Sequence, residues 1–137
     1  MNIRAEKGVD AAFARLDEKF ASGQTFWPAP YNEPTPESLT AFVFDVCETF
    51  NEASGLVERF PQHEYLEKII REWFDTMLSG RVLVIEKSRR LVVSWLLCAC
   101  DVWDAGRRRC NIVQGGIDYD RASDFVYRCW DIYERIR

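Results

Sequence analysis

The strongest constraint on the fold is a change of pattern near residue 81, where short apolar runs begin to alternate with helices. Residues 81–85 (RVLVI) form an apolar run with three β-branched side chains, which is typical of a strand buried on both faces. We expect a buried helix at 92–105, stopped by Gly106, and a second strand at 110–114. A strand, a crossover helix and a strand make a βαβ unit, which implies parallel strands and a right-handed connection.

Apolar periodicity in the first 80 residues predicts three helices joined by a proline-rich connector. We expect these helices at 5–21, from a cap at Ser38 or Thr40 to about Asn51, and at 62–78. The connector, 22–37, has four prolines within nine residues, and they favour an extended path because proline fixes φ and lacks an N–H. Gly55 and Gly80 are expected to end helices. A last helix, capped by Asp118 or Asp120, completes the chain.

The composition places the chain among globular domains and excludes several classes of protein. Apolar residues make up 47% and charged residues 29% of the 137 positions, which is enough for one buried core. No apolar run approaches the roughly 18 residues of a membrane span, and the charged, periodic N-terminus is unlike a secretory signal. Five cysteines without a CxxC pair, and no cysteine near His63, favour reduced thiols in a cytoplasmic protein over a zinc site.

Charge is distributed unevenly along the chain. The net charge is −4, but residues 1–80 hold 7 basic and 14 acidic side chains, whereas residues 81–137 hold 11 and 8. The basic excess begins in VLVIEKSRRLVVSW, residues 82–95, where Lys87, Arg89 and Arg90 follow the first apolar run. This asymmetry is compatible with an anionic ligand on the C-terminal part.

The loop 86–94 has the position of a phosphate-binding loop. Ligands of open parallel sheets bind beyond the carboxyl ends of the strands, and free N–H groups at the start of the next helix favour anions. Against the standard pattern G-x-x-x-x-G-K-[ST], Ser94 aligns with the final position, while Val93 and Val92 replace the lysine and the second glycine. Valine does not readily take a positive φ, so we expect the loop to curve differently. A charged turn on a buried strand is the alternative interpretation.

The stretches VIEKSRRLVVSWLLCACDVWDAGR and NIVQGGIDYDRASDFVYRCWDIYERI resemble the start of the ATPase domain of tailed-bacteriophage terminase large subunits. That family carries a deviant Walker A motif of the type K-S-R-Q-x-x-x-S-W, a Trp-containing helix, a strand, an acidic turn and a helix with F-V-x-R-x-x-x-I-Y. The resemblance covers about residues 56–137, with Arg90 where glutamine is usual. The positions that match in order and spacing are Ser88 to Leu91, Ser94 and Trp95, Trp103 and Asp104, Asp118, and Phe125 to Tyr133.

This resemblance implies an α/β fold in which N-terminal helices precede the first βαβα portion of a P-loop NTPase-type parallel sheet, an incomplete domain. It divides the chain into an N-terminal helical segment, 1–55, and the front part of an ATPase domain, 56–137.

The resemblance also implies a site for ATP and Mg²⁺. The residues of the nucleotide-binding loop would be Lys87, Ser88, Arg89 and Arg90, with the three cations on the β- and γ-phosphates. Ser94 would hold Mg²⁺ through the bound nucleotide. Gln62, in RFPQHEYLEKII, would bind the edge of the adenine through its amide.

Other motifs of that family are missing from the sequence. No apolar run ending in Asp-Glu follows residue 94, although hydrolysis needs such a motif for Mg²⁺ and water activation. The nuclease carboxylates are also missing. We therefore expect an N-terminal fragment of a viral DNA-packaging terminase large subunit, an ATPase and endonuclease, that does not hydrolyse ATP alone.

The implied partners are double-stranded DNA for the full-length protein, and the terminase small subunit and portal. One alternative is a non-catalytic interaction module that docks to the small subunit or portal. Another is a fragment of a different helicase-like ATPase.

Overall fold

The computed structural model describes residues 27–87 and 92–136. Within them it has four α-helices, one π-helical turn and a two-stranded antiparallel sheet. In chain order the elements are α2 (Pro36–Ala41), the π-helical turn η1 (Phe42–Val46), β1 (Glu48–Asn51), β2 (Leu56–Arg59), α3 (Glu64–Ser79), α4 (Val93–Arg108) and α5 (Tyr119–Arg135). The predicted mixture of helix and strand is confirmed at this level. The helix predicted at 5–21 lies outside the described residues.

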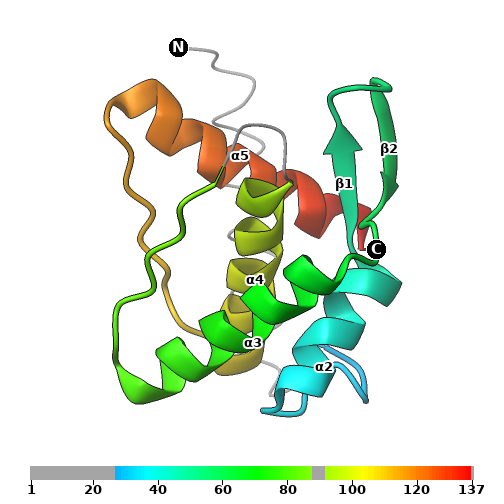
Figure 1. The fold of residues 1–137 in the computed structure, drawn as a ribbon, viewed down its shortest axis with the longest axis vertical. Coiled ribbons are helices and arrows are strands. Elements are labelled where there is room, and N and C mark those ends of the chain that lie inside the picture. The colour runs from blue at the N-terminus through cyan, green and yellow to red at the C-terminus, as the bar shows by residue number, and fades with distance from the viewer. Residues whose placement is uncertain (1–26, 88–91, 137) are drawn as a thin grey trace.

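Helix α4 lies at the centre of the fold, as expected for a helix that is apolar on almost every face. It packs against α3, α5 and η1, and α2 lies beside α3 (Figure 1). Leu96, Cys100 and Trp103 of α4 are fully buried, and Ile70 of α3 and Ile132 of α5 reach the same core. Burial of apolar area stabilises the folded chain by roughly 25 cal/mol per Å². Because core side chains of α3 and α5 pack on α4, this helix organises the packing of the described residues.

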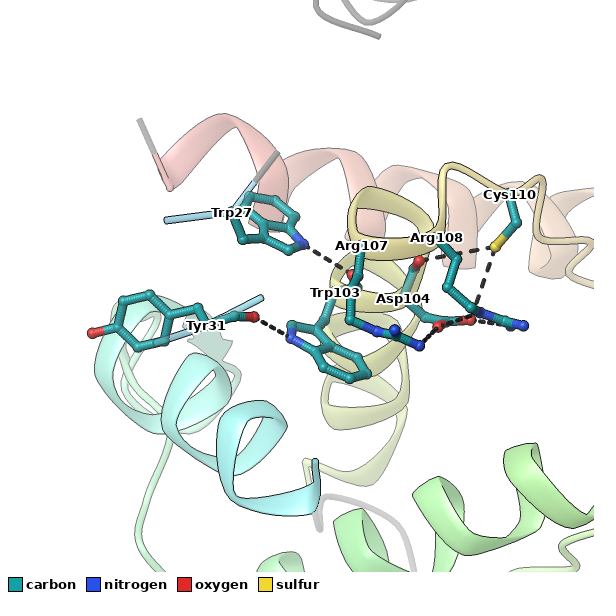
Figure 2. Close-up of polar contacts among 7 residues, drawn as sticks. All are labelled: Trp27, Tyr31, Trp103, Asp104, Arg107, Arg108 and Cys110. Atoms are coloured by element: carbon teal, nitrogen blue, oxygen red, sulfur yellow. Dashed lines mark hydrogen bonds and ion pairs between the residues drawn. The ribbon is translucent and has the colours of Figure 1, made fainter. Parts of the chain in front are cut away.

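The proline-rich connector packs against α4 through aromatic side chains. Trp27 is buried, and its Nε1–H donates to the Trp103 carbonyl oxygen at 2.9 Å. The Trp103 Nε1–H in turn donates to the Tyr31 carbonyl oxygen at 2.7 Å, and Figure 2 shows both bonds meeting at Trp103. Because a buried indole N–H needs a partner, the two bonds fix the path of the connector over the helix.

Helix α2 begins earlier than predicted. Thr35 is its N-cap, and the Thr35 hydroxyl oxygen accepts from the Ser38 N–H at 3.1 Å. Neither Ser38 nor Thr40 is therefore the cap. The helix ends in η1, where the Cys47 N–H donates to the Phe42 carbonyl at 3.2 Å.

A β-hairpin replaces the end of the helix predicted to reach Asn51. Strand β1 pairs antiparallel with β2, with Glu48 opposite Arg59. The Asn51 side-chain oxygen accepts from the Ala53 N–H at 2.9 Å, a local bond that competes with helix formation. Gly55, expected to stop a helix, adopts a φ of 69° in the hairpin turn instead.

The two predicted parallel strands are extended but unpaired. Among the described residues, neither 81–85 nor 110–114 forms a strand or shares a backbone hydrogen bond with another segment. Val82, Val84 and Val113 are 87%, 86% and 94% exposed, so the expectation of strands buried on both faces is wrong. A strand becomes buried only where neighbouring elements cover it, and these side chains lack such cover in the described part of the chain.

The C-terminal end of α3 and the N-terminal end of α5 agree with the predictions. Gly80 follows α3 in the left-handed conformation with a φ of 66°. Asp118 caps α5, since its Oδ1 accepts from the Arg121 N–H at 2.9 Å. Both signals depend on neighbouring residues alone, which is why the sequence reveals them.

Helix α4 continues beyond its predicted end. Gly106 is buried inside the helix, which runs to Arg108. Asp104 stabilises the last turn because its Oδ1 accepts from Arg108 Nε at 2.7 Å and lies 3.5 Å from Arg107 Nη2. Figure 2 shows Asp104 between these two guanidinium groups. Arg107 and Arg108 therefore belong to the helix, beyond the stop expected at Gly106.

The predicted boundary between residues 55 and 56 lies in the turn that joins β1 to β2. Leu39 and Leu66, from opposite sides of this boundary, belong to the same core. The described residues on both sides of the boundary therefore pack together.

All five cysteines are free thiols. None of the helices in 27–87 and 92–136 is long and apolar enough to cross a membrane.

Candidate functional site

A cleft lies at the N-terminal end of α4, between the hairpin turn and the middle of α5. It has a volume of about 420 Å³, which is in the range of small-molecule sites. Its described lining consists of Phe50, Asn51, Glu52 and Ala53 from the hairpin, Lys87, Val92, Val93, Ser94 and Trp95 around the start of α4, and Arg128 from α5.

Two of the predicted site residues, Lys87 and Ser94, line this cleft. Lys87 is exposed at the end of the extended segment 81–87, and Ser94 lies in the first turn of α4. The phosphate-loop hypothesis requires this arrangement, because the cation and the helix N-terminus have to face the same anion. The other loop residues of that hypothesis, Ser88, Arg89 and Arg90, lie outside the described residues.

Val92 precedes α4 in the left-handed conformation, with a φ of 60° and a ψ of 0°. Its carbonyl oxygen accepts from the Leu96 N–H at 2.9 Å. The expectation that valine would avoid a positive φ is therefore wrong, because Val92 adopts a conformation that favours glycine. A β-branched residue in this region is strained, and such strain is often kept at ligand sites.

The first turn of α4 has no side-chain cap, because Val92 carries no polar side-chain atom. The N–H groups of the first helical residues, including Val93 and Ser94, have no acceptor within the helix. Together with the helix dipole, they favour an anion at this end of the cleft.

Arg128 brings a second cation to the cleft. Its Nη2 lies 2.7 Å from Asp124 Oδ2, and its guanidinium carbon lies 5.4 Å from the centre of the Trp95 ring. The carboxylate and the ring together restrict the orientation of the guanidinium. Glu52 is the one carboxylate in the described lining, so Lys87 and Arg128 leave that lining with a positive balance.

A second hollow adjoins the cleft and shares Phe50, Glu52, Trp95 and Arg128 with it. It has a volume of about 430 Å³ and adds further residues of α5: Asp124, Tyr127, Trp130 and Asp131. Its aromatic rings offer flat surfaces on which a planar ligand could stack. Trp95, which is half-buried in the first turn of α4, lines both hollows.

Gln62 lies elsewhere. It is exposed in the segment before α3 and does not belong to the described lining of the cleft. In contrast, Arg128 and the hairpin line the cleft but were not among the predicted site residues. The arginine of the F-V-x-R-x-x-x-I-Y pattern could have indicated Arg128, whereas the hairpin gave no such signal because a helix was expected there.

The residues of the cleft fit a magnesium nucleotide. The described residues contain no group of three or more His, Cys, Asp or Glu side chains that could hold a metal ion. Nucleotide-bound Mg²⁺ does not need such a group, because phosphates and water supply most of its ligands. The Ser94 hydroxyl could supply one more, and Lys87 and Arg128 could neutralise phosphate charge.

No protein-family model, curated protein or solved structure matches this chain.

Proposed function

We propose that this chain is a nucleotide-binding module that resembles the front part of the ATPase motor of a terminase large subunit. The observation that carries the proposal is the cleft at the start of α4, where Lys87, Ser94 and Arg128 converge on an uncapped helix N-terminus. The triphosphate of ATP would lie in this cleft, with Mg²⁺ beside Ser94.

The backbone at Val92 supports phosphate as the ligand. In the standard phosphate-binding loop, a glycine at this position allows the backbone to approach the phosphates. Val92 takes a left-handed conformation without that glycine. A bound anion would explain why this strain is retained, because the turn could then present N–H groups to the anion.

A parallel sheet of the P-loop type is the corresponding fold proposal. Its strands would be 81–85 and 110–114, on either side of α4 in the chain. Both are extended and largely exposed, and both run from the lower to the upper part of the view in Figure 1. The same direction in space and a helix between them are two features of a βαβ unit, and the hydrogen-bonded pairing of the two segments is the part that we propose.

We propose binding rather than hydrolysis as the activity of these residues. Glu52 is the one carboxylate in the described lining, and the sequence lacks an apolar run ending in Asp-Glu after residue 94. In a larger terminase, DNA, the small subunit and the portal would be the partners, and the host cytoplasm would be the compartment.

A non-catalytic interaction module is the second candidate function. It is favoured by the exposed apolar side chains of the extended segments, among them Val82, Val84, Val113 and Ile117. Exposed apolar surface of this kind is typical of protein interaction sites. In that case the basic loop would be incidental to the function.

Calorimetric titration with Mg-ATP tests the nucleotide proposal. We expect the wild-type chain to bind, and Lys87→Ala and Arg89→Ala each to weaken binding about ten-fold, because charge-assisted contacts to phosphate are lost. The matched control is Lys68→Ala, which removes the same charge from the exposed face of α3, outside the described lining. Lys68→Ala should change the affinity less than about two-fold.

A folded wild-type chain that does not bind Mg-ATP would contradict the proposal and leave the interaction module. Equal weakening by Lys68→Ala and Lys87→Ala would show that net charge, not the cleft, governs binding.

A further inference from the structure

Two thiols meet at the contact between α4 and α5. The Sγ of Cys129, on α5, lies 3.7 Å from the carbonyl oxygen of Cys98 on α4. The Sγ of Cys98 lies 3.6 Å from the carbonyl oxygen of Phe125, one helical turn before Cys129. Each thiol therefore contacts a backbone carbonyl oxygen that belongs to the other cysteine or lies one helical turn before it.

Gln114 joins this pair from the extended segment at 110–114, which follows α4. Its Nε2 donates to Cys129 Sγ at 3.3 Å and to Asp101 Oδ2 at 2.7 Å, and its Oε1 lies 3.7 Å from Cys129 Sγ. The Cys129 sulfur thus has polar neighbours and is only partly buried, whereas Cys98 is 1% exposed. The two thiols occupy unequal environments.

The pKa values of the thiols follow these environments. The hydrogen bond with Cys98 is the largest influence on Cys129 and lowers its pKa, and the Gln114 amide lowers it further. The same hydrogen bond, followed by burial, raises the pKa of Cys98. Burial raises the pKa of the other three thiols: Cys47, Cys100 and Cys110. Since the thiolate is the nucleophile, Cys129, which is less buried than Cys98 and accepts from the Gln114 amide, is the better prepared thiol of the pair to react.

We propose that Cys98 and Cys129 form a peroxide-reactive dithiol that closes to a disulfide between α4 and α5. In the first step the Cys129 thiolate attacks one oxygen of hydrogen peroxide, the O–O bond breaks and hydroxide leaves, so that Cys129 becomes a sulfenic acid. In the second step the sulfur of Cys98 attacks the Cys129 sulfur, the S–O bond breaks and the oxygen leaves as water with the proton of the Cys98 thiol. Both sulfurs are oxidised, and the peroxide is reduced.

The disulfide would lie beside the candidate cleft. Trp95 is one helical turn before Cys98, and Arg128 is the neighbour of Cys129 in sequence; these two residues stack at 5.4 Å and line the cleft. A covalent link at this level would hold the α4 and α5 walls of the cleft together. The proposal does not depend on which ligand the cleft binds.

Disulfide mapping of the wild-type chain tests the proposal directly. The reduced protein is exposed to hydrogen peroxide, alkylated and digested with trypsin. We expect the peptide 91–107, which contains Cys98, to be linked to the peptide 129–135, which contains Cys129. Because 91–107 also contains Cys100, the mapping is repeated with Cys100→Ser, and the link should persist. A link between Cys47 and Cys100, a link between two chains, or no link would overturn the proposal.

Single variants test the order of the two steps. In Cys98→Ser, the sulfenic acid of Cys129 cannot be resolved, so dimedone should label it at least about ten-fold more than it labels Cys98 in Cys129→Ser. Cys110→Ser is the matched control and should form the disulfide as the wild type does. Circular dichroism verifies that each variant is folded. Equal labelling of the two single variants would contradict the assignment of Cys129 as the attacking thiol.

Discussion

The helical core and the two extended segments contain similarly apolar sequence but bury it to opposite extents. Trp103 and Leu96 of α4 are fully buried, whereas Val84 and Val113 are 86% and 94% exposed. A helix satisfies its own backbone hydrogen bonds and needs only another surface for its apolar face. A strand also needs the backbone of a neighbouring strand. Apolar character alone therefore does not decide which segment becomes buried.

This difference leaves the four most exposed large apolar side chains of the described residues on the segments before and after α4: Val82, Val84, Val113 and Ile117. Val82 and Val84 precede the candidate cleft, and Val113 lies beside Gln114, which contacts Asp101 and Cys129. The parallel sheet and the interaction surface are two proposals for what covers these side chains. The following changes test this comparison, with Val84→Ala as the matched control for Trp103→Ala.

Trp103→Ala should lower the free energy of unfolding by about 3–5 kcal/mol, because it leaves a cavity in the core and removes the donor to the Tyr31 carbonyl. The wild-type side chain is fully buried and makes that bond at 2.7 Å. Urea unfolding followed by circular dichroism measures the change.

Val84→Ala is the matched control in an extended segment. Since Val84 is 86% exposed, we expect a change below about 0.5 kcal/mol. A loss above about 1 kcal/mol would indicate a buried Val84 and would contradict its exposed position.

Asp101→Asn should stabilise the folded chain near neutral pH. Burial raises the pKa of Asp101 from 3.8 to about 6, against the hydrogen bond from Gln114, and Asp104 raises it further. Between these two values the folded chain binds more protons than the unfolded chain, so this group lowers stability as the pH rises through that window. After allowance for partial exposure, removal of the charge should raise the free energy of unfolding by about 1–2 kcal/mol near pH 7.

Below about pH 4 the gain from Asp101→Asn should vanish, because the wild-type carboxyl is then protonated. The amide oxygen that the substitution introduces can still accept from Gln114. Urea unfolding at the two pH values measures the difference, and a variant no more stable than the wild type near pH 7 would contradict the prediction.

Local signals made most of the helical structure predictable. Gly80 ends α3 and Asp118 caps α5, and each depends on residues within one turn. Gly106 misled the prediction because Asp104 pairs with Arg107 and Arg108 across it and continues the helix. Helix propensity is a weak guide to where a helix ends when such side-chain contacts also stabilise its last turn.

The candidate site was less predictable because its walls come from distant segments. Lys87 and Ser94 are close in sequence and both line the cleft, but the hairpin at Asn51 and the guanidinium of Arg128 reach it only through packing. Val92 was misjudged because the steric preference of an isolated valine does not include the contacts that hold a loop in a strained conformation.

Hydrogen exchange with and without saturating Mg-ATP tests the nucleotide cleft most directly. We predict slower exchange in the first turn of α4, residues 92–96, and in the hairpin turn at 51–53, because bound phosphate would accept from free N–H groups and close the cleft. Helix α3, from Glu64 to Ser79, should exchange as it does without nucleotide. Unchanged exchange at 92–96, or protection confined to other parts of the chain, would contradict the proposal that this cleft binds nucleotide phosphate.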